Sequence, residues 1–281
     1  MDERTRSLDR TAIYHYRLDR LLGEGGTGIV YRGRDSKSGE VVAVKVFRQN
    51  FFRNQLHKRD MAKTARRFKK LTHQNLVQIY DFIDGREGEC LIMEYVDGPN
   101  LNWYIKNRPW NLQERLVIVA QICNGLQFLH DHGFVHHDFK PANVIFTRQG
   151  QVKVADFALW GSSVLVSLLD RDAAYSQITP MYIAPELILK EKATVQSDMY
   201  SLGITMYIMF ANRFPFETDN LQKLYIQHLK AIPEHPTFYN KGCPRELGDI
   251  IVKMIDKKPE NRFRDFDQIR IALADVGRGR I

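Results

Sequence analysis

The spacing of apolar and polar positions changes once along the chain, near residue 97. Before that point, β-branched and polar residues alternate in short segments that glycine-rich or polar turns separate. An alternation with a period of two predicts strands. The expected strands lie at 16–25, 28–35, 40–47, 76–82 and 89–95, and one helix is expected over about 56–71.

The remainder of the chain has mainly the spacing of helices. Residues 97–100, DGPN, break the pattern and are the expected hinge. Residues 112–133 carry apolar residues at helical spacing, and residues 194–212 are apolar nearly all round, which predicts a buried helix. Two short strands are expected between these helices, at 143–146 and 151–156.

These patterns predict an α+β fold with two lobes and a cleft between them. We expect an N-terminal extension at 1–15, a small β-rich lobe with one helix at 16–95, and a larger, mainly helical lobe at 96–281. A chain of 281 residues is long enough to build two such lobes within one domain. Its apolar fraction of 44% and charged fraction of 26% are those of an ordinary globular protein.

The positive charge of the chain is concentrated in the expected helix. The net charge is +8, and residues 48–70 hold nine Lys or Arg against a single acid, Asp60, so this segment accounts for the whole excess (9 − 1 = 8). Two interpretations remain open for it, a solvated helix face and a patch that binds an acidic partner, a phosphate group or a second subunit. Nucleic acid is disfavoured because no aromatic stacking platform accompanies the charge.

Several other classes of protein are disfavoured by the sequence. Cys90, Cys123 and Cys243 show no paired spacing, so a disulfide framework or a structural zinc site is not expected. The first ten residues are charged from the second onward, unlike a signal peptide. The longest apolar run, residues 202–211, is too short to cross a bilayer. We therefore expect a cytoplasmic protein without a membrane segment.

A glycine-rich turn followed by a buried lysine indicates a phosphate-binding site in the first lobe. The turn at 23–28, GEGGTG, is flanked by strands on both sides, whereas a dinucleotide-binding motif would have a helix after it. The backbone of such a hairpin can lie over the phosphates of a nucleotide. Lys45 lies within the apolar strand VVAVKVF, and a buried ammonium needs an anionic partner. A triphosphate and a carboxylate would supply it.

A second group of polar residues surrounds the two short strands of the larger lobe. Asp138 and Asn143 belong to HHDFKPAN, and Asp156 follows the second strand in VADFA. One aspartate, an asparagine five residues later and a second aspartate can serve as a general base and two Mg²⁺ ligands.

With these motifs the chain resembles a eukaryotic-like (Hanks-type) serine/threonine protein kinase, over about 16–274. Three further matches make the resemblance specific. The segment 184–186 matches the APE motif of the family, and Asp198 with Gly203 matches the DxxxxG of its central buried helix. Arg262 matches the arginine that pairs with the APE glutamate. The short chain, nearly all of it kinase domain, resembles the bacterial branch of the family.

The resemblance implies a role for each of these residues. Gly23, Gly25 and Gly28 would cover the phosphates of ATP, and Lys45 would hold the α- and β-phosphates. Asp138 would accept the proton of the substrate hydroxyl, and Lys140 would steady the γ-phosphate. Asn143 and Asp156 would bind Mg²⁺, with Mn²⁺ as the alternative metal. The implied contacts of the adenine and its surroundings are Leu22, Val30, Ala43, Met93 as gatekeeper, Glu94, Val96 and Ile145. The implied regulatory spine comprises His136, Phe157, Phe68 and Ile79, which also read as ordinary core. Lys140 and Thr179 match the serine/threonine branch of the family.

Three positions depart from the family pattern. His137 stands where the arginine of the HRD motif is usual, and a histidine is mostly neutral near pH 7. We therefore predict that activity does not depend on phosphorylation of the activation loop, whose hydroxyl residues are Ser162, Ser163, Ser167, Tyr175, Ser176 and Thr179. Ala158 replaces the glycine of DFG, which restricts the backbone there.

The third departure lies on the basic helix. Thr64 stands where the family has the glutamate that pairs with Lys45, and Asp60 lies four residues earlier on the same helix face. Asp60 could take over the pairing if the helix shifted by about one turn, roughly 5.4 Å. The alternative is that Asp60 is a surface acid.

Three functions remain in view at this stage. The first is an active kinase that transfers the γ-phosphate of ATP to Ser or Thr hydroxyls of proteins. The second is a pseudokinase that binds ATP or a partner and transfers little phosphate, and the third is a kinase for small molecules. Because Lys45, Asp138, Asn143 and Asp156 are all present, the first is favoured.

Overall fold

The computed structural model describes residues 12–49, 51–52, 54–157 and 179–278. They form two compact units, one ending at Asp97 and the other beginning at Gly98. The boundary falls within the DGPN segment.

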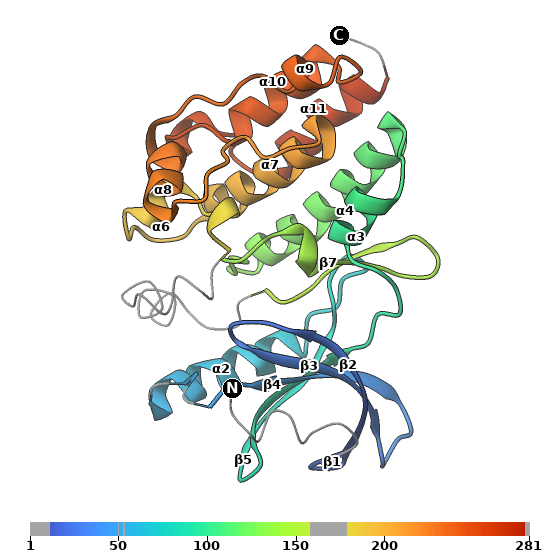
Figure 1. Cartoon of the computed structure of the whole chain (residues 1–281). Coiled ribbons are helices and arrows are strands. Elements are labelled where there is room, and N and C mark those ends of the chain that lie inside the picture. Colours follow the sequence, from blue (N-terminus) through green and yellow to red (C-terminus); the bar gives the residue numbers. More distant parts are fainter. Residues whose placement is uncertain (1–11, 50, 53, 158–178, 279–281) are drawn as a thin grey trace. The chain divides into compact units, whose positions relative to one another are not determined.

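The first unit is a six-stranded antiparallel sheet with one helix packed against it (Figure 1). The strands lie in the order β1-β2-β3-β4-β6-β5. Their bounds are Ala12–Ile13 (β1), Tyr16–Glu24 (β2), Gly28–Asp35 (β3), Val41–Phe47 (β4), Ile79–Gly85 (β5) and Gly88–Glu94 (β6). Alternate residues of the strands, including Leu18, Tyr31, Val44 and Ile92, form a buried cluster. Four of the five strands predicted in this part are confirmed, and the fifth, expected at 76–82, lies three residues later as β5.

The helix of this unit, α2 (Gln55–Phe68), begins where its capping residue requires. The Asn54 side chain accepts a hydrogen bond from the backbone N–H of His57, which satisfies one of the free donors at the helix start. The buried side chains are His57, Met61, Ala65 and Phe68. This spacing of four, four and three residues gives one apolar face, which packs on the sheet next to β5.

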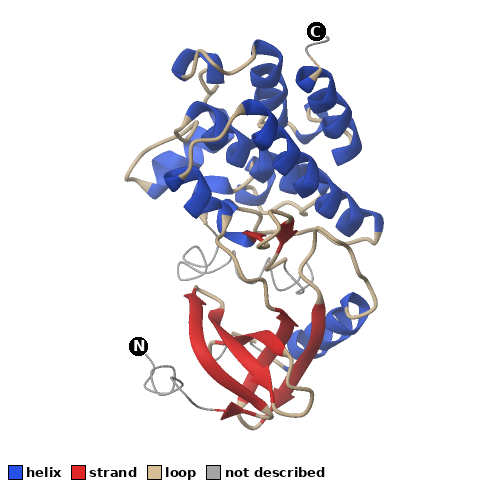
Figure 2. Ribbon diagram, turned by 90° about the vertical axis from the view of Figure 1, so that its right-hand side faces the viewer, coloured by secondary structure: helices blue, strands red, loops and turns tan. Residues whose placement is uncertain are grey.

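The second unit is mainly helical (Figure 2). Its first half contains α3 (Leu101–Asn107), α4 (Leu112–Asp131), the 3-10 turn η1 (Pro141–Asn143), β7 (Val144–Phe146) and β8 (Val152–Val154). Its second half contains η2 (Pro180–Tyr182), α6 (Pro185–Ile188), α7 (Val195–Ala211), α8 (Leu221–Lys230), α9 (Pro236–Tyr239), α10 (Arg245–Met254), η3 (Pro259–Asn261) and α11 (Phe266–Gly277).

Helix α7 is the buried centre of this unit. Every residue from Ser197 to Ala211 is buried, as the all-round apolar pattern predicts. Gly203 is required because a Cβ at this position would lie 2.6 Å from Cγ2 of Ile255 and 2.9 Å from Cβ of Met254. Helix α10 packs against α7, and α11 packs against α4. The α+β fold class, with a β-rich and a helical part, is confirmed.

Two expectations on composition can be compared with the described residues. Cys90, Cys123 and Cys243 are buried free thiols. Within the described ranges, the helices are too short or too polar to span a membrane.

Candidate active site

In the first unit, the glycine-rich turn joins β2 to β3 with its backbone held at two points. Gly25 and Gly28 exchange backbone hydrogen bonds of 2.9 and 3.4 Å across the turn. Arg48 reaches the tip from the end of β4, donating to the Gly25 carbonyl at 3.2 Å and to the Glu24 carboxylate at 2.7 Å. Sequence reasoning did not identify Arg48, whose partners lie more than twenty residues away.

Of the four glycines in this turn, Gly23, Gly25 and Gly28 are glycine for different reasons. A Cβ on Gly28 would overlap the backbone carbonyl of Val46, so β4 approaches too closely for any side chain there. At Gly23 and Gly25 a Cβ would meet no atom within 4 Å. The backbone at these two positions is therefore uncovered, as a phosphate-binding turn requires.

Lys45 is buried at the centre of the sheet. It pairs with Val30 on β3 and with Leu91 on β6, and its side chain is 2% exposed. Ala43 precedes it by two residues on the same face of β4 and pairs with Met93. This unit thus places the predicted lysine beside the residues expected around the adenine.

The predicted hinge residues continue from β6. The backbone N–H of Glu94 donates to the Gln78 carbonyl at 2.8 Å. The Tyr95 hydroxyl donates to the Asp97 carboxylate at 2.9 Å and accepts a hydrogen bond from Arg20 on β2. Val96 lies between Tyr95 and Asp97, which are joined by this hydrogen bond. Leu22, on β2, is exposed.

Helix α2 shows no carboxylate bonded in the position that the family pattern would fill. Thr64 and Asp60 are both half-buried. Their side chains make no hydrogen bond or ion pair to the residues that the structure describes. The substitution of Asp60 for the missing glutamate stays a prediction.

In the second unit, the predicted catalytic residues converge on one lysine. The ammonium of Lys140 donates to Oδ2 of Asp138 at 2.6 Å and to Oγ1 of Thr179 at 2.8 Å. The Asn143 side chain donates from Nδ2 to the Asp138 backbone carbonyl at 2.9 Å. Burial raises the pKa of Asp138, although Lys140 opposes the shift. A basic carboxylate therefore lies beside a fixed positive charge.

A buried aspartate fixes the backbone on which Asp138 sits. The Asp198 carboxylate, in the first turn of α7, accepts the backbone N–H groups of His136 at 2.6 Å and His137 at 3.0 Å. Nε2 of His130 lies 3.0 Å from the same carboxylate. Burial alone would raise the pKa of Asp198, but hydrogen bonding and charge from His130 bring it below its usual value. His137 has a φ of 68°, which a loop held at two consecutive N–H groups imposes.

The two predicted metal ligands are neighbours through the backbone. The N–H of Ala155 donates to the Asn143 carbonyl at 2.7 Å, which brings the end of β8 and Asp156 to the 3-10 turn. Asp156 has a φ of 55° and is half-buried. Phe157 is buried, with its ring 6.3 Å from the ring of His136.

The donor set of this unit fits a magnesium ion. Asn143 commits its amide nitrogen to Asp138, so its Oδ1 is the atom left for a cation, and Asp156 adds a carboxylate. Mg²⁺ prefers such oxygen ligands and takes the remainder of its shell from water and substrate phosphates. Within the described ranges there is no cluster of three or more acidic, His or Cys side chains that could hold a metal by itself.

The remaining predicted positions either lie deeper in this unit or fall outside the described residues. Arg262 makes a buried two-pronged pair with Glu186, at 2.8 and 2.9 Å, and Ser197 donates to the same carboxylate at 2.7 Å. Ile145 is half-buried on β7, while Phe68 and Ile79 are buried in the first unit. Positions outside the described residues are Ala158, Ser162, Ser163, Ser167, Tyr175 and Ser176.

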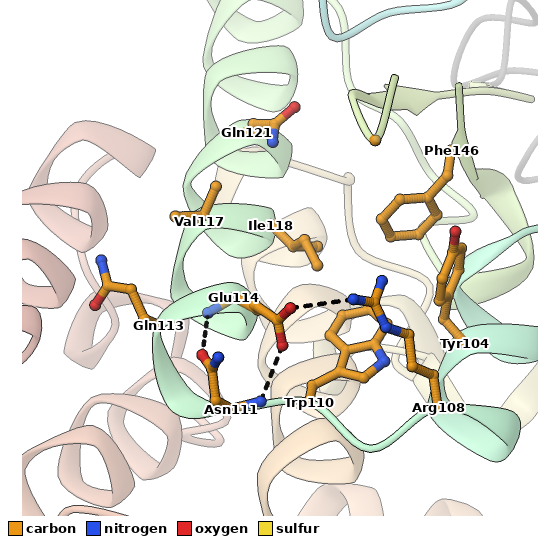
Figure 3. A pocket seen from close by; sticks show the side chains of 11 residues that line it. Tyr104, Arg108, Trp110, Asn111, Gln113, Glu114, Val117, Ile118, Gln121 and Phe146 are labelled. Atoms are coloured by element: carbon orange, nitrogen blue, oxygen red, sulfur yellow. Dashed lines mark hydrogen bonds and ion pairs between the residues drawn. The ribbon is translucent and has the colours of Figure 1, made fainter. Parts of the chain in front are cut away.

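A separate cavity of about 330 Å³ lies between α3, α4 and β7 (Figure 3). Tyr104, Trp110 and Phe146 form an aromatic wall, and Arg108 pairs with Glu114 at 3.1 Å beside it. Its lining includes none of the predicted catalytic or nucleotide-binding residues.

Comparison with known proteins gives consistent matches over nearly the whole chain. A family model described as "Protein kinase domain" matches residues 16–270. "Probable serine/threonine-protein kinase PknB" of Lactococcus lactis is 30% identical over 261 residues, which are 92% of this chain and 41% of that protein. "Serine/threonine-protein kinase PknB" of Mycobacterium leprae is 30% identical over 269 residues, 94% of this chain and 43% of that protein. The chain thus spans about two fifths of the length of these relatives.

Solved structures show the same fold. A crystal structure of the kinase domain of PknI from Mycobacterium tuberculosis superposes with a TM-score of 0.74 at 21% identity, covering 95% of this chain and 98% of that one. A single-site mutant of the same domain gives a TM-score of 0.75, again at 21% identity, over 96% and 98% of the two chains.

Proposed function

Since the chain belongs to the protein kinase family, in its bacterial Hanks-type branch, we propose that it transfers the γ-phosphate of ATP to Ser or Thr hydroxyls of proteins. The observation that carries this proposal is the arrangement of Asp138, Lys140 and Thr179 in the second unit. The same lysine bonds the proposed base and a hydroxyl side chain. Lys140 and Thr179 are also the two positions that match the serine/threonine branch.

In the proposed reaction, Asp138 orients the substrate hydroxyl and accepts its proton as the oxygen attacks the γ-phosphorus. The bond between the γ-phosphorus and the oxygen that bridges it to the β-phosphate breaks, and ADP leaves. The raised pKa of Asp138 favours proton acceptance. Lys140 places positive charge beside the phosphoryl group in transfer, where negative charge is spread over the equatorial oxygens. The Asp198 carboxylate holds the loop so that Asp138 needs no rearrangement.

The nucleotide is proposed to bind through the glycine-rich turn, Lys45 and the backbone of residues 94–96. Lys45 meets the α- and β-phosphates, and the uncovered backbone at Gly23 and Gly25 lies over the phosphates. Because the N–H of Glu94 is already donated to Gln78, the adenine is left the Glu94 carbonyl and the backbone of Val96. The remaining proposed contacts are Leu22, Gly28, Val30, Ala43, Met93 and Ile145.

Asn143 and Asp156 are the proposed ligands of Mg²⁺, with Mn²⁺ as the alternative. Held by these two residues, a divalent cation would supply positive charge to offset the negative charge that develops during transfer. The chain contributes two oxygen ligands and fixes one of them through the hydrogen bond from Asn143 to Asp138.

A pseudokinase is the second candidate because Thr64 provides no carboxylate for Lys45. One assay separates the two candidates. Incubation with γ-labelled ATP and Mg²⁺ or Mn²⁺ should label the protein or a generic substrate with the wild type and not with Asp138→Asn. Nucleotide binding with no transfer by the wild type would establish the pseudokinase instead.

We also propose that the outer end of the basic helix, namely Arg66, Lys69 and Lys70, docks an acidic protein segment. All three are exposed and form no ion pair with the described residues. Changing the three to Glu lowers the net charge from +8 to +2 (three changes of two units). The proposal predicts that this variant binds an acidic peptide such as poly-Glu more weakly. Unaltered binding would show that the basic surface is only a solvated helix face.

A further inference from the structure

Helix α2 is tied to the sheet by a second device besides its apolar face. Lys58, one residue beyond the buried His57, reaches two carboxylates of the β5–β6 hairpin. Its ammonium forms an ion pair with Glu89 and a second with Asp84, the latter at 3.4 Å. The Lys58 side chain is 21% exposed and that of Glu89 16%. Hydrogen bonding to Glu89 raises the pKa of Lys58, so the lysine stays charged.

The positive charge of Lys58 also stabilises the two acids with which it pairs. Asp84 and Glu89 are direct partners in the β5–β6 register. Like charges opposite each other on neighbouring strands repel. Lys58 is the cation that both of them contact, so its removal would leave two carboxylates facing one another at the end of a hairpin.

The hairpin that carries the acids is itself braced. Tyr14, next to β1, donates twice to its turn: the Tyr14 backbone N–H reaches Glu87 at 2.7 Å, and the hydroxyl reaches the Gly88 carbonyl at 2.8 Å. A Cβ on Gly85 would lie 2.5 Å from the Tyr14 hydroxyl, so the contact is close. Lys58 is therefore attached to a fixed point of the sheet.

We propose that Lys58 is a positioning residue that holds α2 in place of the missing carboxylate at Thr64. The lysine clamp, meaning Lys58 with Asp84 and Glu89, sets the helix from its hairpin side. Thr64 carries no carboxylate, and the Asp60 carboxylate of α2 makes no hydrogen bond or ion pair to the described residues. The position of α2 then depends on the contacts of Lys58 with the β5–β6 hairpin. As a statement about catalysis this rests on the proposed kinase function, whereas the effect on α2 does not.

The test compares Lys58→Met with Lys63→Met, a matched change on the same helix at an exposed lysine without an ion pair to the described residues. Amide exchange of α2 in the nucleotide-free protein should be about tenfold faster in Lys58→Met and unchanged in Lys63→Met. Exchange across β2 and β3 should stay slow in both, which shows that the unit is still folded.

Kinetics and rescue distinguish positioning from a general loss of structure. In Lys58→Met, kcat should fall about three- to tenfold with KM for ATP within about twofold. Lys58→Arg should restore both readouts, and Glu89→Lys should partly rescue Lys58→Glu. Equal exchange of α2 in Lys58→Met and Lys63→Met would overturn the proposal. A wild type that transfers no phosphate would defeat the proposed function, while the exchange result would still decide the role of the clamp.

Discussion

At the scale of single residues, His137 is the residue on which the predicted response to loop phosphorylation depends. Its imidazole is half-buried, and Nδ1 is buried without a hydrogen-bond partner in the described part of the chain. Burial lowers the pKa of His137; the charge of Asp198 opposes this shift, and the neighbouring His136 and His130 add to it. The side chain is therefore neutral at pH 7, when an arginine would be charged.

Phosphatase treatment is thus expected to leave the rate nearly unchanged. We predict a change in kcat of less than about twofold, because a neutral imidazole gains little from a phosphorylated loop. The measurement is kcat before and after treatment, with loss of phosphate verified by mass spectrometry. His137→Arg serves as the comparison, since a permanent cation could pair with phosphate. A wild type inactivated by the phosphatase would contradict the prediction.

The ionised carboxylate of Asp138, which the proposed activity needs, is expected to lower the stability of the folded chain. Its pKa is raised in the folded chain, chiefly by burial, so the folded state binds a proton more tightly than the unfolded state. A raised carboxyl pKa means that the native state loses stability as pH rises from the unfolded pKa through the folded one. At pH 7 the charged form is therefore a burden on folding.

Asp138→Asn removes that burden together with the base. We predict that kcat falls by roughly 10²–10⁴-fold, the usual contribution of a general base. The melting temperature at pH 7 should equal or exceed that of the wild type, and the difference should disappear near pH 4. Differential scanning fluorimetry across pH tests this. A melting temperature several degrees lower at pH 7 would show that the pair with Lys140 outweighs the cost of burial.

At the scale of elements, helix α2 shows where sequence reasoning succeeds and where it stops. Its apolar spacing predicts a helix over 56–71, and the structure has it at Gln55–Phe68, ending a turn earlier. The basic outer face could also be read from the sequence. The partners of Lys58 could not, because Asp84 and Glu89 meet it only through the register of a hairpin about thirty residues away.

The motifs of the second unit were predictable because their residues are close in sequence. Asp138, Lys140 and Asn143 lie within six positions, and the structure joins them by hydrogen bonds. The bonds from Arg48 to the glycine-rich turn and from Arg20 to Tyr95 could not be predicted in this way. Their partners are distant in sequence and are brought together by strand pairing. The pattern of apolar residues predicts the elements, but it does not predict which side chains distant in sequence will meet.

The pair of Glu186 and Arg262 joins α6 to the segment after η3. Both side chains are nearly fully buried, and Arg262 also donates to the backbone carbonyls of Gln196 and Asp256 at 2.7 and 2.9 Å. Removing one partner of a buried pair leaves an uncompensated charge and costs about 3–5 kcal/mol.

Arg262→Met is therefore predicted to lower the free energy of unfolding by about 3–5 kcal/mol. The buried Glu186 carboxylate would lose its cation, and the backbone carbonyls of Gln196, Asp256 and Lys257 would lose a donor. Urea unfolding measures the change. Arg264→Met is the control, because its side chain is 81% exposed and its pair with Asp265 lies on the surface. A loss below about 1 kcal/mol for Arg262→Met would show that water replaces the guanidinium.

At the scale of the whole molecule, the fold and the chemistry place different demands on metal. Each unit has its own apolar core, around Val44 and Ile92 in the first and around α7 in the second. Asn143 and Asp156 are the proposed metal ligands, and Asn143 is already anchored to Asp138 by its amide. The described residues offer no group of three metal-binding side chains. Folding should therefore proceed without metal, while transfer should need it.

Chelation with EDTA is predicted to abolish phosphotransfer and to leave the melting temperature of the nucleotide-free protein unchanged to within about 1 °C. Adding back Mg²⁺ or Mn²⁺ should restore the rate, and the ratio of the two rates identifies the better metal. Asn143→Ala and Asp156→Ala should each raise the metal concentration needed for half-maximal rate, because Asn143 and Asp156 are the two proposed oxygen ligands. Ca²⁺, which binds oxygen ligands with looser geometry, is the control and should restore little activity. A fall of several degrees on chelation would show instead that a metal holds the fold together, which would require ligands beyond these two.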